Sequence, residues 1–350
     1  MRKYSYIFLF IFVTSLLLSC KGKQAQTESN EDNTVTEITD RISDEPLPDN
    51  ESNNPKNVQL KAISPSLIDV EAFKGDLISQ SAAFSRIQQR LINDLLELDS
   101  SSVKALGEAK DVLKKYFKNV TAKQSDSLYV AYLTYASLFK SYVVNDEYYS
   151  QVAADYFGSY ESFEDLPLAY QPIMKELNSY GIQLEDIGEG CADLSFYPDY
   201  YYEIFKPYTT EATREYLRLM AFERANEFLF DAAVCITWEE LADRIVNFEK
   251  YLDKYPHSMF ANDIKDSYNR YTSLLLTGCD NTPTRDSQQN GLLKLNADVY
   301  EAYQRIASTY QHRRLAKIVK EYCSLFEENN MLWNDELDDF LAKDDFATRY

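Results

Sequence analysis

Two histidines and 56 acidic residues are the groups from which a catalytic site would have to be built. Nucleophilic catalysis usually needs a histidine beside the nucleophile, and only His257 and His312 are available. His257 lies in a predicted turn, where we expect it to close a helix end. His312 begins a basic strip that continues through Arg313, Lys317 and Lys320. We interpret this strip as a solvated helix face, with a surface for an anionic partner as the alternative.

The carboxylates are so numerous that no pair stands out as a general acid and base. Glycoside cleavage needs one carboxyl group with a raised pKa at a fixed distance from a second, and a sequence reveals neither. A carboxylate-based hydrolase of cell wall or glycan therefore stays as one alternative. Residues 280–286 lack the glycine and terminal Glu of a calcium loop, and the nine glycines form no phosphate-binding motif. We predict no catalytic residue, no metal and no cofactor.

The most distinctive segment spans residues 196–208, which hold seven aromatic residues in thirteen. Tyrosine offers a rigid contact area and a hydroxyl, which suits recognition of a glycan or a peptide. Consecutive tyrosines cannot all face one core, so at least one should point to solvent or into a groove. The other interpretation, which we favour, is that these rings bridge two helical layers. The candidate ligand-binding residues are Tyr197, Tyr200, Tyr201, Tyr202 and Tyr208.

Four cysteines follow residue 20, and outside the cytoplasm they would be able to form disulfides. Cys235 and Cys323 lie in apolar helical runs, where small buried residues are expected. Cys191 and Cys279 lie in predicted loops beside glycines. These two are the candidate disulfide pair.

The first twenty residues have the parts of an export signal. Arg2 and Lys3 precede an apolar run of thirteen residues, which at about 1.5 Å per residue is too short to span a bilayer as a helix. The run ends in Leu16-Leu17-Leu18-Ser19-Cys20. This ending resembles the lipobox of bacterial lipoproteins, which implies removal of the signal at 1–19 and lipid attachment to Cys20. The alternative is an ordinary cleaved signal with a chance cysteine.

Lipid attachment would place the protein in the bacterial cell envelope. Several acyl chains hold a protein firmly on a bilayer, and Lys21 is not the Asp that resembles an inner-membrane retention signal. We therefore expect the outer membrane, facing the periplasm. The net charge of -20 repels nucleic acid and gains nothing from anionic lipid, so the acyl chains alone must anchor the protein.

Residues 20–66 contain no Phe, Trp or Tyr and are rich in polar and acidic residues. They bury too little apolar surface to offset the entropy of ordering, so we predict a flexible acidic linker. From residue 67 the apolar spacing becomes helical, and no alternating strand of useful length is found. The predicted class is all-α, built from antiparallel helical hairpins, with helical regions at 67–145 and 209–345 and an irregular aromatic-rich segment at 146–208.

Particular residues predict where helices start and stop. A single helical face is predicted from the spacing of Leu77, Phe84, Ile87, Leu91, Leu95 and Leu98. Helix starts are predicted near Thr209 or Thr210 and in a capping box at Thr237, and a further cap is predicted at Ser258. Gly278 should end the last of these helices.

The segment Phe248-x2-Tyr251-x4-Pro256 resembles the junction between two tetratricopeptide helix pairs. The resemblance covers residues 248–278 and implies an irregular array of helical hairpins, because no second copy of the motif follows. We predict a non-enzymatic binding or scaffold protein whose partner is another envelope protein or a glycan. The alternatives are capture of a glycan or peptide by residues 196–208, and the hydrolase named above.

Overall fold

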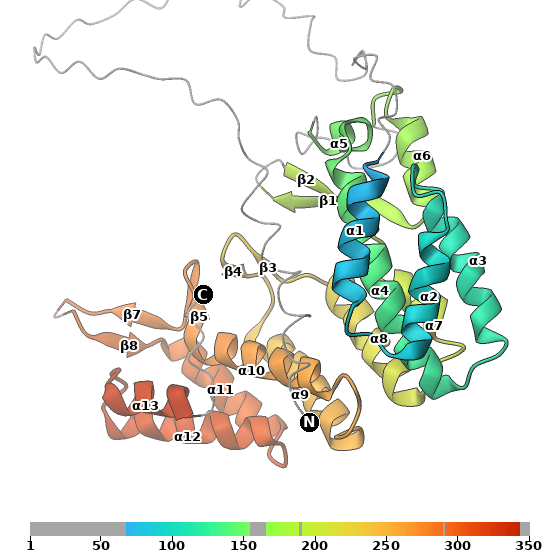
Figure 1. Ribbon diagram of the computed structural model, residues 1–350. Helices are drawn as coiled ribbons and strands as arrows, with labels where there is room; N and C mark the ends of the chain where they lie inside the picture. Colours follow the sequence, from blue (N-terminus) through green and yellow to red (C-terminus); the bar gives the residue numbers. More distant parts are fainter. Residues whose placement is uncertain (1–67, 155–165, 189–190, 290, 344–350) are drawn as a thin grey trace, which may run out of the picture. The chain divides into compact units, whose positions relative to one another are not determined.

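The computed structural model describes residues 68–154, 166–188, 191–289 and 291–343 (Figure 1). Within these residues the protein has thirteen helices and a few short antiparallel strands, which confirms the predicted all-α class. They all belong to one unit, Lys56–Tyr350. The predicted signal at 1–19, Cys20 and the linker at 20–66 lie outside the described residues.

The helices before residue 230 are α1 Val70–Ser81, α2 Arg86–Leu96, α3 Ala105–Phe117, α4 Ala122–Asn145, α5 Glu147–Ala154, α6 Gln171–Ser179, α7 Tyr200–Phe205 and α8 Glu211–Ala225. The later helices are α9 Trp238–Lys254, α10 Ala261–Thr277, α11 Ala297–Thr309, α12 Arg314–Glu328 and α13 Asp335–Lys343. The strands pair as β1 Ile182–Gly188 with β2 Cys191–Phe196, β3 Leu229–Phe230 with β4 Ala233–Val234, β5 Gly278–Cys279 with β6 Thr282–Pro283, and β7 Arg285–Ser287 with β8 Leu293–Leu295.

Helices neighbouring in sequence also pack against one another. Helix α9 packs along α10, and α11 packs along α12, so each pair forms a helical hairpin (Figure 1). Helix α4 is the centre of the first part of the chain, where α1, α2 and α5 all contact it. Its buried residues include Leu128, Tyr132, Tyr135 and Phe139, which follow the helical spacing that the sequence shows.

Local capping residues begin three of the central helices. At α9 the amide of Glu240 donates to Oγ1 of Thr237 (3.2 Å) and the Glu240 carboxylate accepts from the amide of Thr237 (2.9 Å). This pair confirms the predicted capping box. Thr121 and Gln124 make the same arrangement at α4. At α8 the cap is Thr210, one of the two residues predicted for this role.

The predicted single face from Leu77 to Leu98 is wrong, because the chain forms two helices there. Helix α1 ends at Ser81 and α2 begins at Arg86. Ser85 starts the second helix, and its amide donates to the side chain of Gln88 at 2.9 Å. An N-cap satisfies the amides of a new helix, so the chain turns here while both helices still bury apolar residues against α4.

The start predicted at Ser258 is also displaced, whereas the end at Gly278 is confirmed. Helix α10 begins at Ala261, and the hydroxyl of Ser258 accepts from the amide of Phe260 (3.2 Å) in the turn before it. At Gly278 φ is +69°, and an added Cβ would lie 2.3 Å from the carbonyl oxygen of Thr282. Only glycine fits there.

The hairpin β1–β2 contradicts the expectation that the chain has no strand of useful length. Ile182 lies opposite Phe196 and Leu184 opposite Leu194, while α5 packs on β2 and α6 on β1. Ile182 and Leu194 are buried against these helices. Each strand has so few apolar positions that the alternation in the sequence is too short to stand out.

Candidate binding pocket and aromatic segment

The aromatic segment at 196–208 forms α7 and the turns on either side of it. Tyr200 and Tyr201 are only 5% and 4% exposed, and Phe205 is fully buried. The hydroxyl of Tyr200 is 2.8 Å from that of Tyr132 on α4, and the hydroxyl of Tyr201 is 3.1 Å from Oγ of Ser137. Because α7 also packs against α8, these rings connect α4 and α8.

The other three candidate tyrosines are more accessible than Tyr200 and Tyr201. Tyr197 is half-buried, and its amide donates to the carbonyl of Gly181 at 2.9 Å. Tyr202 is half-buried and has Lys206 above its ring, at 5.2 Å from the centroid. Tyr208 is 40% exposed and stacks on Phe117, with 4.0 Å between ring centroids. Tyr200 and Tyr201 are therefore core residues, whereas the other three expose part of their side chains to solvent.

The two candidate disulfide cysteines lie on different hairpins. Cys191 begins β2 and Cys279 ends β5, and no disulfide joins them in the part of the chain that the structure describes. Cys323 is buried in α12, as its apolar surroundings predict, and burial raises the pKa of its thiol to about 12. Cys235, expected to be buried, is exposed because it lies in the loop before α9.

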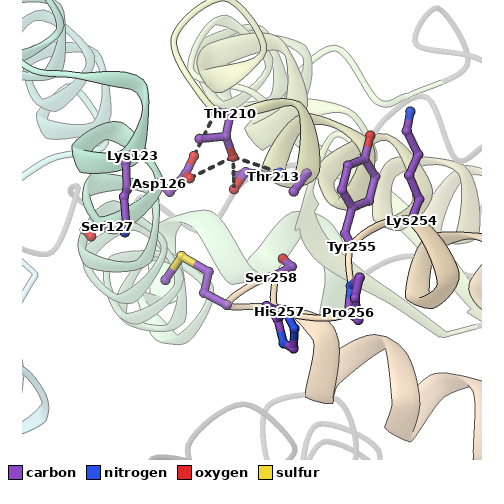
Figure 2. A pocket seen from close by; sticks show the side chains of 12 residues that line it. Lys123, Asp126, Ser127, Thr210, Thr213, Lys254, Tyr255, Pro256, His257 and Ser258 are labelled. Atoms are coloured by element: carbon purple, nitrogen blue, oxygen red, sulfur yellow. Dashed lines mark hydrogen bonds between the residues drawn. The ribbon is translucent and has the colours of Figure 1, made fainter.

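A pocket of about 600 Å³ lies where the starts of α4 and α8 meet the loop between α9 and α10 (Figure 2). The residues that line it are Lys123, Asp126, Ser127, Thr210, Ala212, Thr213, Lys254, Tyr255, Pro256, His257, Ser258 and Met259. None of the five candidate tyrosines is among them. His257 lines the pocket, and so does Pro256, the last residue of the motif that resembles a tetratricopeptide junction.

Asp126 joins two of the pocket walls. This residue of α4 is 6% exposed, and its carboxylate accepts from the amide (3.0 Å) and Oγ1 (2.8 Å) of Thr210 (Figure 2). Thr210 in turn caps α8 through the amide of Thr213. Asp126 thus holds the start of α8 against α4, and its oxygen atoms are committed to that contact.

A second set of contacts fixes the opposite wall. The hydroxyl of Tyr251 donates to the carbonyl of Ala212 at 3.2 Å and lies 2.7 Å from Oγ of Ser258. Lys254 is exposed and pairs with Glu211 at 2.7 Å, a bond that raises the pKa of Lys254 and lowers that of Glu211. These bonds hold the α9–α10 loop beside the start of α8.

The pocket offers charge and apolar contact. Lys123, Lys254 and His257 are exposed, and Met259 is an apolar residue at 52% exposure. The hydroxyl of Ser258 is bonded to Tyr251 and that of Thr210 to Asp126, so both are held by structural contacts. This chemistry suits docking of a polar chain with an apolar side group.

Arg313, which follows His312 in the basic strip, forms a hydrogen bond with α9. Arg313 donates to Asp253 at 3.0 Å, whereas Lys317 and Lys320 are exposed on α12.

Across the described ranges, no group of His, Cys, Asp and Glu side chains is placed to hold a metal ion. No helix among those residues has both the length and the apolar character that crossing a bilayer requires.

Sequence reasoning missed the pocket because its walls come from three separate parts of the chain. The caps at Thr210 and Thr121 were the local signals available, since they mark two of the helix starts that meet there.

Comparison with protein-family models, with curated proteins and with solved structures finds no match to this chain.

Proposed function

We propose that this protein is a lipid-anchored, non-enzymatic binding protein of the bacterial cell envelope that acts as a scaffold for another macromolecule. The support for the anchor is the sequence up to Cys20, which resembles a lipoprotein signal and lipobox. The acyl chains hold it at the outer membrane facing the periplasm, and the acidic linker at 20–66 lets the helical body stand away from the bilayer.

The observation that carries the binding function is the pocket between α4, α8 and the α9–α10 loop. Lys123 and Met259 are both exposed and line this pocket, in a protein whose net charge is -20, whereas Lys254 is paired with Glu211. An acidic protein segment with an apolar side chain complements both features. The partner is therefore another envelope protein.

Photo-crosslinking tests this proposal at one residue. A photoreactive amino acid replaces Met259 in the full-length, membrane-bound protein, and Ile78 of α1, which is 57% exposed, is the matched control position. We expect one envelope protein to crosslink from position 259 and not from position 78. Lys123→Glu should lower that yield several-fold, because it reverses a charge at the pocket. Recovery of polysaccharide alone, with no protein crosslinked from position 259, contradicts the scaffold function.

One observation favours glycan capture by the aromatic segment as a second candidate function. Tyr202 is half-buried and Tyr208 is 40% exposed, so part of the segment presents tyrosine ring surface to solvent. Accessible tyrosine rings suit contact with a sugar.

A further inference from the structure

Cys235 and Cys279 lie at the same end of the α9–α10 helical hairpin. Cys235 lies in the loop just before α9 begins at Trp238, and Cys279 directly follows Gly278, which ends α10. Helices α9 and α10 pack along one another and are joined by residues 255–260, so the start of α9 and the end of α10 lie at the same end of the pair. The fold therefore brings together two cysteines that are distant in the sequence.

A hydrogen bond joins the chain beside Cys235 to the hairpin β5–β6. The amide of Val234 donates to Oγ1 of Thr282 at 2.9 Å. Thr282 lies directly opposite Cys279 in the register of this hairpin. The residue before Cys235 thus contacts the residue that is paired with Cys279. The strands β4 and β5 also pack on each other, with Cα atoms that approach to within 8 Å.

The thiol of Cys279 faces the segment that leads to Cys235. Opposed residues of an antiparallel pair project from the same face, so Cys279 shares a face with Thr282, whose hydroxyl contacts β4. Cys279 is half-buried, whereas Cys235 is exposed. A disulfide joins Cα atoms about 4.4 to 6.8 Å apart. Because Cys235 lies outside any helix or strand, a small adjustment of its loop brings its thiol to Cys279.

The other two described cysteines are less well placed to pair with Cys279. Cys323 is buried in α12, where burial raises the pKa of its thiol to about 12, so it is rarely present as the thiolate that disulfide exchange requires. Cys191 begins β2, which packs on β1, α4 and α5, whereas β5 packs on β6, α10 and β4. Position therefore favours Cys235 as the partner of Cys279, in place of the pair of Cys191 and Cys279 that the sequence suggests.

We propose that Cys235 and Cys279 form a disulfide once the chain reaches an oxidising compartment. The proposal rests on the export of the protein, which is part of the proposed function. The exposed thiolate of Cys235 attacks the disulfide of an envelope thiol oxidoreductase and forms a mixed disulfide. The thiolate of Cys279 then attacks Sγ of Cys235 and releases the oxidoreductase. The two thiols of this protein thereby lose two electrons and two protons, and the disulfide of the oxidoreductase takes them up and becomes a dithiol.

The bridge closes a loop that contains the whole α9–α10 hairpin. A cross-link reduces the conformational entropy of the unfolded chain, and the stabilisation grows with the length of the closed loop. The far end of the same hairpin includes residues 255–259, which line the pocket. The disulfide thus stabilises the pair of helices that carries one wall of the pocket.

Peptide mapping of the mature full-length protein tests the pairing. The protein is purified from the membrane fraction, its thiols are blocked with iodoacetamide in denaturant, and its peptides are examined by mass spectrometry without reduction. We expect one linked pair of peptides that contains Cys235 and Cys279, with Cys191 and Cys323 alkylated. The same link should form again when the reduced, folded protein is exposed to oxidised glutathione.

Single variants and thermal unfolding check the assignment. Cys235→Ser and Cys279→Ser should each abolish the linked peptides. Cys191→Ser, which changes another half-buried cysteine, is the matched control and should retain them. A reducing agent should lower Tm of the wild type and of Cys191→Ser by several degrees, because the unfolded chain regains entropy. It should leave Tm of Cys235→Ser unchanged.

Two results would overturn the proposal. One is a linked pair of peptides that contains Cys191 and Cys279. The other is protein from the envelope in which Cys235 and Cys279 are both alkylated. Failure of export gives a different result, namely an uncut protein in the cytosol with reduced thiols. In that protein a link between Cys235 and Cys279 after treatment with oxidised glutathione supports the pairing, and its absence removes the pairing as well.

Discussion

Buried charged side chains in this protein join segments that are distant in the sequence. Arg244 is 7% exposed, pairs with Glu223 at 2.8 Å and lies over the ring of Phe228. Glu249, also 7% exposed, accepts from the amides of Arg314 and Leu315. Because these groups are paired, their role is to hold helices together.

Asp263 is the carboxyl group whose environment predicts a pH effect on stability. Burial, with a smaller contribution from Asp266, raises its pKa from 3.8 to about 6, although a hydrogen bond from Tyr216 opposes the shift. A raised pKa in the folded state means that the protonated form is favoured by folding. Asp263 therefore contributes no penalty to the free energy of unfolding below about pH 4, where it is protonated in the folded state. The folded state loses stability relative to the unfolded state as the pH rises through about 6 and the buried carboxyl group ionises.

Asp263→Asn should remove this pH dependence. At pH 7 we expect the free energy of unfolding to exceed that of the wild type by roughly 1 to 2 kcal/mol, allowing for partial exposure of the side chain. The difference should vanish near pH 4. Urea unfolding across this pH range measures it, with Asp286→Asn on exposed β7 as the control. A constant difference from pH 4 to pH 7 would disprove the assignment.

At the scale of elements, carboxylates from other helices cap the starts of two helices. Asp126 of α4 caps the start of α8, and Glu249 of α9 caps the start of α12. Each contact satisfies amides that a helix start leaves unpaired and places a negative charge at the positive end of the helix dipole. These caps fix where α8 and α12 begin in space.

Asp126→Ala should lower the free energy of unfolding by about 1 to 3 kcal/mol, because it leaves two partly buried donors of Thr210 without this partner. Asp111→Ala is the matched control, since this residue is exposed and pairs with Lys114 at the surface. It should change stability by less than about 0.5 kcal/mol. Denaturant unfolding of both variants gives the comparison, and equal losses would show that Asp126 has no special role.

The elements that the sequence predicts well are those with local signals. The capping box at Thr237 and the glycine at 278 act within a few residues, so their effects appear in the sequence itself. The break at Ser85 was missed because the apolar spacing continues across it. The hairpin β1–β2 is held by α5 and α6, and such tertiary packing leaves little local trace.

At the scale of the whole molecule, the aromatic segment and the pocket show different limits of sequence reasoning. The tyrosines at 200 and 201 are conspicuous in the sequence, yet their hydroxyls pair with α4 and their rings are buried. The pocket is made by Asp126, Thr210 and Ser258, which only the folded chain brings together. Sequence patterns name unusual residues, whereas long-range packing decides which ones meet solvent.

The central claim is that the chain is cut before Cys20, lipidated there and held in the cell envelope. Metabolic labelling with radioactive palmitate tests it most directly, with Cys20→Ala as the matched variant. The account predicts label in the wild-type protein of the membrane fraction and none in the variant. An unlabelled, full-length wild-type protein recovered from the cytosol would contradict it.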